Sequence, residues 1–162
     1  MATLVSKIKV ILIGAGQLGS RHLQSIKSVA AVEEIWIVDP SLESLTIAKD
    51  RYESIKANHE IKVRFETSLP TDCDFDFAII ATGSAVRAKV TQELVEKNNV
   101  RFILFEKILF SKEADYDQIE KLLASKSIRA WVNCTMRQMP IYRNIKTGCD
   151  TRSCKQACTH SI

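Results

Sequence analysis

The sequence contains no hydrophobic run that approaches the ~20 residues needed to cross a bilayer. Its first segment, Met1–Lys9, lacks the apolar core and small-residue cleavage site of a signal peptide. Charge of one sign is also scarce, because 23 Lys and Arg residues stand against 19 Asp and Glu residues. Such a surface offers no concentrated field to nucleic acid or to an anionic membrane. We therefore expect a cytoplasmic, globular protein with neither of these partners.

Cysteine is sparse except near the end of the chain. Cys73 and Cys134 lie far apart in the sequence, and in a reducing compartment the prediction for both is an unpaired, buried thiol. The segment 147–162 has no strand or helix period and few apolar residues, so we expect an irregular, disordered tail without a metal site. The alternative is a zinc knuckle, although the C-x4-C-x3-C-x-H spacing matches no common zinc module; its ligands would be Cys149, Cys154, Cys158 and His160.

Apolar stretches of strand length alternate with stretches of helical period along the chain. This alternation predicts an α/β fold, a doubly wound parallel sheet of the Rossmann type with strand order 3-2-1-4-5-6. Most of the strands are continuous apolar runs, typical of strands covered on both faces, whereas the third alternates and is expected nearer an edge. The strands are predicted at 9–14, 35–39, 61–65, 77–82, 102–107 and 128–133.

Between these strands, apolar residues recur at the spacing of a helix that packs one side on a sheet. The link between Phe65 and Phe75 is too short and polar for a helix, and we expect it to carry the chain to the second half of the sheet. The four predicted buried stripes are Leu18, His22, Ile26 and Ala30; Leu42, Leu45, Ala48, Tyr52 and Ile55; Val86, Val90 and Leu94; and Tyr116, Ile119 and Leu123.

Three glycines, Gly14, Gly16 and Gly19, form the pattern G-x-G-x-x-G between the first strand and the first helix. The first would permit a tight turn, the second would let a pyrophosphate approach, and the third would let helix and strand pack closely. A generic glycine turn is the alternative. Asp39, at the end of the second strand, suits the ribose hydroxyls of NAD and would repel the 2′-phosphate of NADP. We therefore predict an NAD site, with NADP less favoured, at Gly14, Ala15, Gly16, Gln17, Leu18, Gly19 and Asp39.

Four stretches occur in the order and approximate spacing of a known family: "VILIGAGQLGSRH", "AIIATGSAVRAKVTQELVE", "FILFEKILF" and "WVNCTMRQMPIY". Over residues 7–146 the chain resembles the Gfo/Idh/MocA family of NAD(P)-dependent sugar and polyol oxidoreductases. The resemblance implies an NAD(P)-binding Rossmann domain at 1–146, followed by the irregular tail at 147–162. Members of the family continue into a second α/β domain that supplies an Asp and a His. This sequence has no counterpart of that domain, and we expect a truncated chain that is incomplete as a catalyst.

The resemblance also assigns roles to single residues. Lys107 resembles the catalytic lysine beside the nicotinamide and the substrate, and Glu106 resembles its acidic neighbour at the cofactor. The chain departs from the family at Ile108, where a proline is usual, and at Arg87, where a histidine is often found. The remaining cofactor contacts implied are Thr82, Gly83 and Ser84 after the fourth strand, and Arg137 after the sixth.

Two functions of different classes are consistent with these patterns. The first is the nucleotide-binding part of an oxidoreductase that transfers a hydride at a sugar or polyol hydroxyl. The second is a non-catalytic NAD-binding sensor or interaction module. The dinucleotide is the expected partner in both cases, a sugar or polyol substrate is expected only in the first, and a homo-oligomer is compatible with either.

Overall fold

The computed structural model describes residues 7–56 and 59–140, without the side chains of Arg137 and Gln138. The chain divides after Val132 into two units. The tail predicted at 147–162 and its four candidate zinc ligands lie outside the described residues, as does the predicted domain boundary after residue 146. The described part of the second unit contains one short 3-10 helix, Thr135–Gln138.

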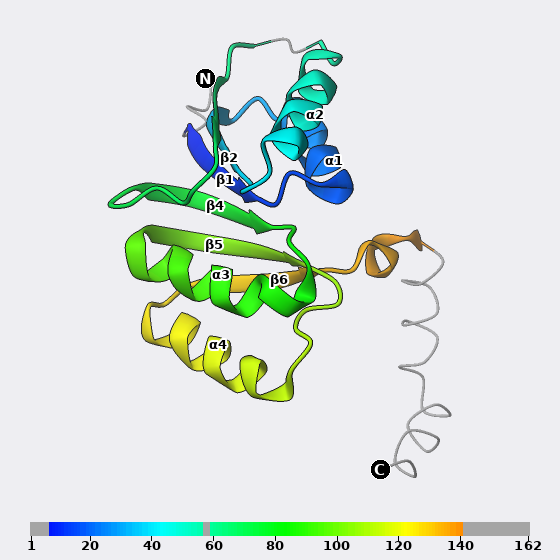
Figure 1. Ribbon diagram of the computed structural model, residues 1–162. Helices are drawn as coiled ribbons and strands as arrows, with labels where there is room; N and C mark the ends of the chain where they lie inside the picture. Colours follow the sequence, from blue (N-terminus) through cyan, green and yellow to red (C-terminus); the bar gives the residue numbers. More distant parts are fainter. Residues whose placement is uncertain (1–6, 57–58, 141–162) are drawn as a thin grey trace, which may run out of the picture. The chain divides into compact units, whose positions relative to one another are not determined.

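A six-stranded sheet organises the first unit (Figure 1). The strand order is β3-β2-β1-β4-β5-β6, which confirms the order predicted from the sequence. The four pairings β3 with β2, β2 with β1, β1 with β4 and β4 with β5 are parallel. The strands are β1 (Ile8–Ile13), β2 (Val32–Val38), β3 (Lys62–Glu66), β4 (Asp74–Ile80), β5 (Asn99–Glu106) and β6 (Arg129–Asn133).

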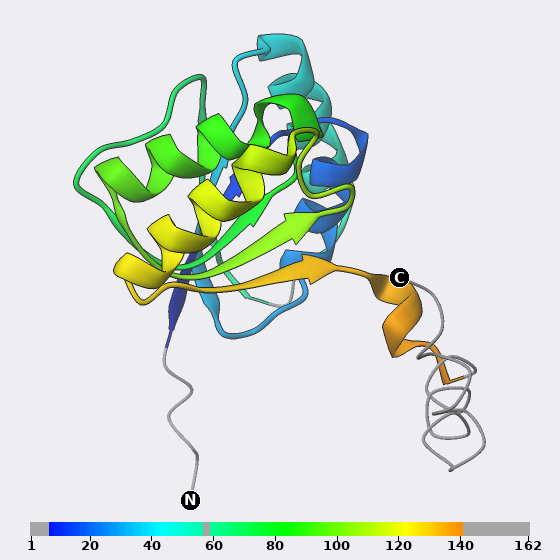
Figure 2. The ribbon, with the colours of Figure 1, turned by 90° about the horizontal axis from the view of Figure 1, so that it is seen from below.

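Two helices cover each face of this sheet (Figures 1 and 2). α1 (Gln17–Ile26) and α2 (Leu42–Glu53) lie on one face, while α3 (Ser84–Lys97) and α4 (Glu113–Ser125) lie on the other. The link between β3 and β4 contains no helix, as its polar sequence predicted. None of the helices in the described part of the chain is long and apolar enough to cross a membrane.

The core consists of two apolar layers, one on each face of the sheet. Along β1, Val10 and Leu12 pack toward α1 and α2, whereas Ile11 and Ile13 pack toward α3 and α4. This alternation follows from the two-residue period of a strand. It requires a continuous apolar run because both faces are covered, and the run "VILI" supplies one.

The first residues of the predicted helical stripes are exposed rather than buried. Leu18, Leu42, Val86 and Tyr116 all lie in the first turn of a helix, and Ala30 lies beyond the end of α1. Each first turn begins past the carboxyl end of the preceding strand, so its apolar side chain has less sheet to pack against. The stripes were therefore predicted wrongly at their first residues and at Ala30. They were predicted correctly at six positions that are buried, namely Ile26, Leu45, Ala48, Leu94, Ile119 and Leu123.

The two edge strands, β3 and β6, differ in their exposure to solvent. β3 carries charged side chains, and its Arg64 donates to Glu34 at 2.8 Å and lies over the ring of Trp36. β6 was predicted to be covered on both faces, which is wrong, because its residues 129–132 are exposed. Its Trp131 packs only on the edge of the sheet, with its ring centroid 5.7 Å from that of Phe102.

The cysteines of the described residues are unpaired, as predicted, but they are not buried. Cys73 and Cys134 are both half-buried. Cys73 lies in the link before β4, where its thiol donates to the carbonyl of Thr71 at 3.4 Å. This link between β3 and β4 contains no helix, and a loop on the protein surface leaves the side chain of Cys73 partly exposed to solvent.

Candidate functional site

Two of the three fingerprint glycines are required by the protein's own structure. Gly14 follows β1 with φ +97°, a conformation that side chains disfavour, and a Cβ there would lie 2.9 Å from the main chain of Ala81. A Cβ at Gly19 would lie only 1.7 Å from the carbonyl oxygen of Gly14. These two glycines therefore permit the sharp turn and the close approach of α1, as the fingerprint predicted.

Gly16 is different, because nothing in the protein itself requires a glycine there. Its φ is −59°, which any residue adopts, and no heavy atom lies within 4 Å of a Cβ built at this position. It is the N-cap of α1 and supplies no side-chain hydrogen bond to the helix, whose first turn holds no acidic residue. The first N–H groups of a helix have no intrahelical acceptor, so this end is open to an anion.

Asp39 has a structural role that the sequence did not reveal. Its Oδ2 accepts a hydrogen bond from the main-chain N–H of Ala15 at 2.7 Å, and its Oδ1 accepts one from Ser41 at 2.9 Å. The carboxylate thus joins the glycine turn to the start of α2. An ionised carboxylate has about four acceptor positions, so two bonds leave capacity for the hydroxyls of a ribose.

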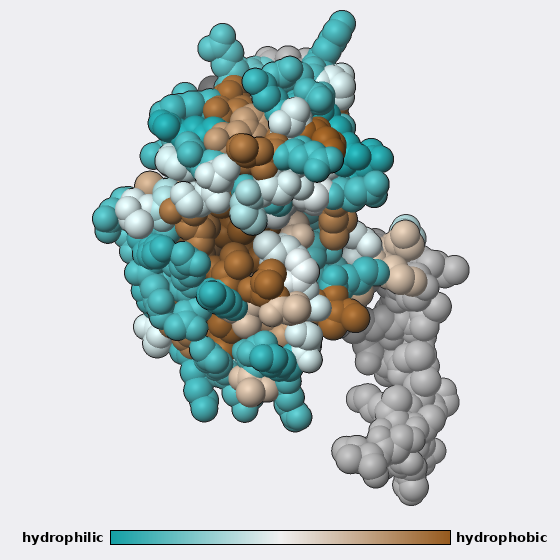
Figure 3. Space-filling model, viewed as in Figure 1, coloured by the Kyte–Doolittle hydropathy of each residue, from teal (hydrophilic) through white to brown (hydrophobic). Residues whose placement is uncertain are grey.

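A pocket of about 660 Å³ lies beside the glycine turn. This volume is in the range of small-molecule sites. Seen from the side of Figure 1, hydrophobic side chains reach the surface in the middle of the described part, with hydrophilic ones around them (Figure 3). The pocket is lined by Ile13, Gly14, Gly16, Val38, Asp39, Pro40, Thr67, Ser68, Leu69, Ala81, Thr82, Gly83, Val86, Lys89, Val90 and Glu93.

The loop after β4 contributes an unsatisfied hydroxyl to this pocket. Thr82 and Gly83 both line it, and the Oγ1 of Thr82 is buried without a hydrogen-bond partner in the structure. A buried hydroxyl is normally satisfied, by protein, water or ligand. Ser84 begins α3, and Gly83 caps that helix without a side-chain hydrogen bond. The loop is therefore able to donate to a bound molecule.

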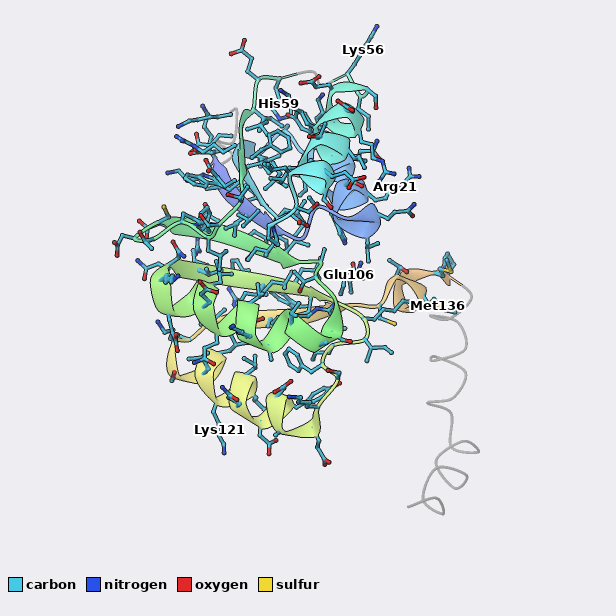
Figure 4. All side chains as sticks on the ribbon, in the orientation of Figure 1. Arg21, Lys56, His59, Glu106, Lys121 and Met136 are labelled. Carbon is cyan, nitrogen blue, oxygen red and sulfur yellow. The ribbon has the colours of Figure 1, made fainter. Side chains whose placement is uncertain are left out.

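The end of β5 is tied to α1 by a contact that sequence reasoning missed. The Nε2 of His22 lies 2.6 Å from the Oε1 of Glu106, and both side chains are largely buried. Figure 4 shows Glu106 in the interior at the end of β5, whereas Arg21, the helix neighbour of His22, points outward. The position of His22 one turn after Gly19 was the available sign, since that turn faces the carboxyl ends of the strands.

Lys107 follows Glu106 and is exposed. The peptide bond between Lys107 and Ile108 is cis. Neither Lys107 nor Glu106 lines the pocket beside the glycine turn, whereas Gly14, Gly16 and three other predicted contacts do. Six further predicted contacts also lie outside that lining: Ala15, Gln17, Leu18, Gly19, Ser84 and Arg137. Of these, Ala15 donates its main-chain N–H to Asp39, and Gln17, Leu18 and Gly19 form the first turn of α1. The side chain of Arg137 is not described.

Arg87 occupies the position where the family often has histidine, and it is 3% exposed. Burial lowers the pKa of its guanidinium, while the nearby negative charge of Glu106 opposes this shift and favours the charged form. An arginine keeps its proton even with such a shift, because its ordinary pKa lies far above neutrality. The charged guanidinium of Arg87 is therefore buried next to the end of β5.

No protein-family model matches the chain, and no curated protein matches it significantly. Solved structures do. The apo scyllo-inositol dehydrogenase of Lactobacillus casei aligns with a TM-score of 0.73 at 14% identity, covering 93% of this chain and 43% of the dehydrogenase. The fold is a Rossmann fold.

Two further structures carry different cofactors. The WlbA dehydrogenase of Chromobacterium violaceum, in complex with NADH and UDP-GlcNAcA, aligns with a TM-score of 0.72 at 20% identity over 91% of this chain and 40% of its own. KijD10, a 3-ketoreductase of Actinomadura kijaniata in complex with TDP-benzene and NADP, aligns with a TM-score of 0.70 at 15% identity over 90% and 44%.

These structures, an inositol dehydrogenase, a dehydrogenase in complex with UDP-GlcNAcA and a 3-ketoreductase, share the fold that the resemblance in the sequence implies, so the resemblance is confirmed at the level of the fold. The chain spans less than half of the length of each of these structures.

Proposed function

We propose that the chain is the NAD(P)-binding domain of an oxidoreductase that acts on a hydroxyl of a sugar or polyol. The observation that carries this proposal is Gly16. The turn at Gly14 and the contact at Gly19 explain two glycines of the fingerprint within the protein, but the open space at Gly16 leaves the third unexplained unless a ligand approaches there. A dinucleotide pyrophosphate is the ligand for which this pattern is built.

The residues around the pocket fit such a ligand. The N–H groups of the first turn of α1 would hold the pyrophosphate, Asp39 would accept hydrogen bonds from the ribose hydroxyls, and the unsatisfied hydroxyl of Thr82 would donate to the ligand. A bound nicotinamide supplies the acceptor or donor of hydride.

Lys107 is the residue of this chain proposed to act on the substrate. It follows directly on β5, at the carboxyl ends of the strands, where ligands of doubly wound proteins bind. Its exposed ammonium is free to reach a hydroxyl group, to orient it and to stabilise negative charge on its oxygen. The sugar or polyol class comes from the resemblance and from the neighbours' own substrates.

Asp39 is expected to set the preference between NADH and NADPH. Replacing it with alanine removes the repulsion of a 2′-phosphate, so the ratio of NADPH to NADH affinity should rise about 10- to 100-fold. Fluorescence titration with each nucleotide measures the ratio. The ratio is the readout because the loss of the bond to Ala15 affects both nucleotides alike.

Asp39→Asn is the matched control, since it keeps the shape and one carbonyl acceptor but removes the charge. It should move the ratio in the same direction. If both affinities fall equally in both variants, Asp39 acts only by supporting the glycine turn, and the predicted preference for NAD is wrong.

Lys107→Ala is expected to lower turnover without weakening NADH binding. Loss of a group that assists proton transfer lowers rates by about 10²- to 10⁴-fold. A panel of sugars and polyols with NAD, followed by absorbance of the reduced cofactor, measures turnover. Lys112→Ala, at another exposed lysine of the same loop, is the control.

Equal rates in these two variants would contradict the role of Lys107. NADH binding without turnover of any compound in the panel is the result expected both of an incomplete catalyst and of a non-catalytic NAD-binding module, so turnover that is lost in Lys107→Ala is the result that supports the enzyme.

A further inference from the structure

Arg87 is a buried cation that the proposed chemistry does not use. It lies in the first turn of α3. Its Nη1 shares two N–H groups among the carbonyl oxygens of Glu106, Ile108 and Leu109, the last at 2.9 Å, and its Nη2 donates to the carbonyl oxygen of Thr82. One side chain therefore satisfies four main-chain acceptors.

These acceptors belong to two segments at the carboxyl ends of the strands, one after β4 and one at the end of β5. Thr82 lies in the loop between β4 and α3, which lines the pocket, and the others lie at or beyond the end of β5, around Lys107. We propose that Arg87 is a positioning residue that fastens these two loops together and so holds the Lys107 end of the site in shape. This inference rests on the proposed function and adds the residue that organises its substrate side.

The shape of the guanidinium suits this task. It is planar, it carries donors that point in several directions, and its hydrogen bonds are strengthened by charge. A lysine ammonium is a single point with three donors, and it would not span two loops. Arg87→Lys therefore keeps a buried positive charge but breaks part of the connection.

Glu106 extends the connection to a third segment. Its carboxylate contacts His22 of α1 at 2.6 Å, and its negative charge favours the charged form of Arg87. The cation and the anion are both nearly inaccessible to solvent, so each reduces the electrostatic cost of burying the other. The helix that Gly16 caps and the loop that carries Lys107 are thereby linked.

Amide hydrogen exchange of the full chain without any nucleotide tests the connection directly. In Arg87→Lys, amides of residues 82–84 and 106–110 should exchange at least about tenfold faster than in the wild type, while those of β1 change less than about twofold. Arg101→Lys is the control, because Arg101 is an exposed arginine of β5 that pairs with Asp76 and contacts neither loop. It should leave the exchange of both loops unchanged.

Binding of NADH and of AMP then tests the consequence for the site. AMP lacks the nicotinamide half, which the resemblance places beside Lys107. In Arg87→Lys the affinity for NADH should fall at least about tenfold, whereas that for AMP should change less than about twofold, because only the preorganised nicotinamide end is disturbed.

The outcomes separate this inference from the function on which it rests. Faster exchange spread evenly over the whole sheet, no change in exchange, or equal losses for NADH and AMP would each overturn the positioning role. Absence of NADH binding in the wild type would reject the proposed function, and with it the role of Arg87 in a site. If Arg87→Lys does not fold, Arg87→Gln, which has no buried charge to solvate, is measured against the same criteria.

Discussion

Gly16→Val should weaken NADH binding about 100-fold or more while the protein remains folded. The Cβ of a residue at this position has no protein atom within 4 Å, and the backbone there has an ordinary φ of −59°. The side chain would instead occupy the space in front of the first N–H groups of α1, where the pyrophosphate is proposed to lie. The lost interactions are hydrogen bonds to a charged group, which are stronger than neutral ones.

Isothermal titration of NADH into both proteins measures this difference, and urea unfolding provides the control. Valine is a poorer N-cap than glycine, so we expect the free energy of unfolding to fall by no more than about 1 kcal/mol. Gly16→Ala should lie between the wild type and the valine variant in affinity. Equal affinities in all three proteins would mean that nothing binds in front of α1.

Gly19→Ala should have the opposite consequence, a large loss of stability. Its Cβ would lie 1.7 Å from the carbonyl oxygen of Gly14, so α1 has to move away from the turn. Inserting an atom into a rigid main-chain contact costs about 3 kcal/mol or more, because neither side is a flexible side chain. Urea unfolding followed by circular dichroism measures the change.

Gly83→Ala is the matched control for this loss. Gly83 is the N-cap of α3, and a Cβ there meets no atom within 4 Å. We expect the free energy of unfolding of Gly83→Ala to stay within about 1 kcal/mol of that of the wild type. Similar stabilities for the Gly19 and Gly83 variants would show that α1 does not approach Gly14 as closely as the structure has it.

The sheet could be predicted from the sequence because its determinants are local. The continuous apolar run "VILI" predicts a strand that is covered on both faces, and the glycine turn predicts a helix directly after it. The polar link between Phe65 and Phe75 is too short to hold a helix. These patterns, repeated along the chain, allow few topologies other than the observed strand order. The exposure of Leu18 and its counterparts was not predictable, since it depends on how far each helix extends past the sheet.

The contacts that organise the site could not be predicted because they join distant residues. His22 and Glu106 are 84 positions apart. The place of His22 one turn after Gly19 indicates that it lies near the carboxyl ends of the strands, but nothing in the sequence identifies Glu106 as its partner. Arg87 was noted only as a departure from the family, and its four acceptors are main-chain carbonyls, which leave no trace in a sequence. Asp39 was predicted as a ribose ligand, but its bond to Ala15 depends on the tertiary path of the glycine turn.

The location of the bound dinucleotide tests the central claim most directly. Amide hydrogen exchange of the wild-type chain, with and without saturating NADH, reports which main-chain groups the nucleotide covers. We predict that NADH slows exchange of residues 15–19 by more than about tenfold, with smaller protection at 82–84 and none at 98–101, which lie at the opposite end of the sheet. Protection absent from 15–19, or concentrated at the opposite end of the sheet, would contradict the site.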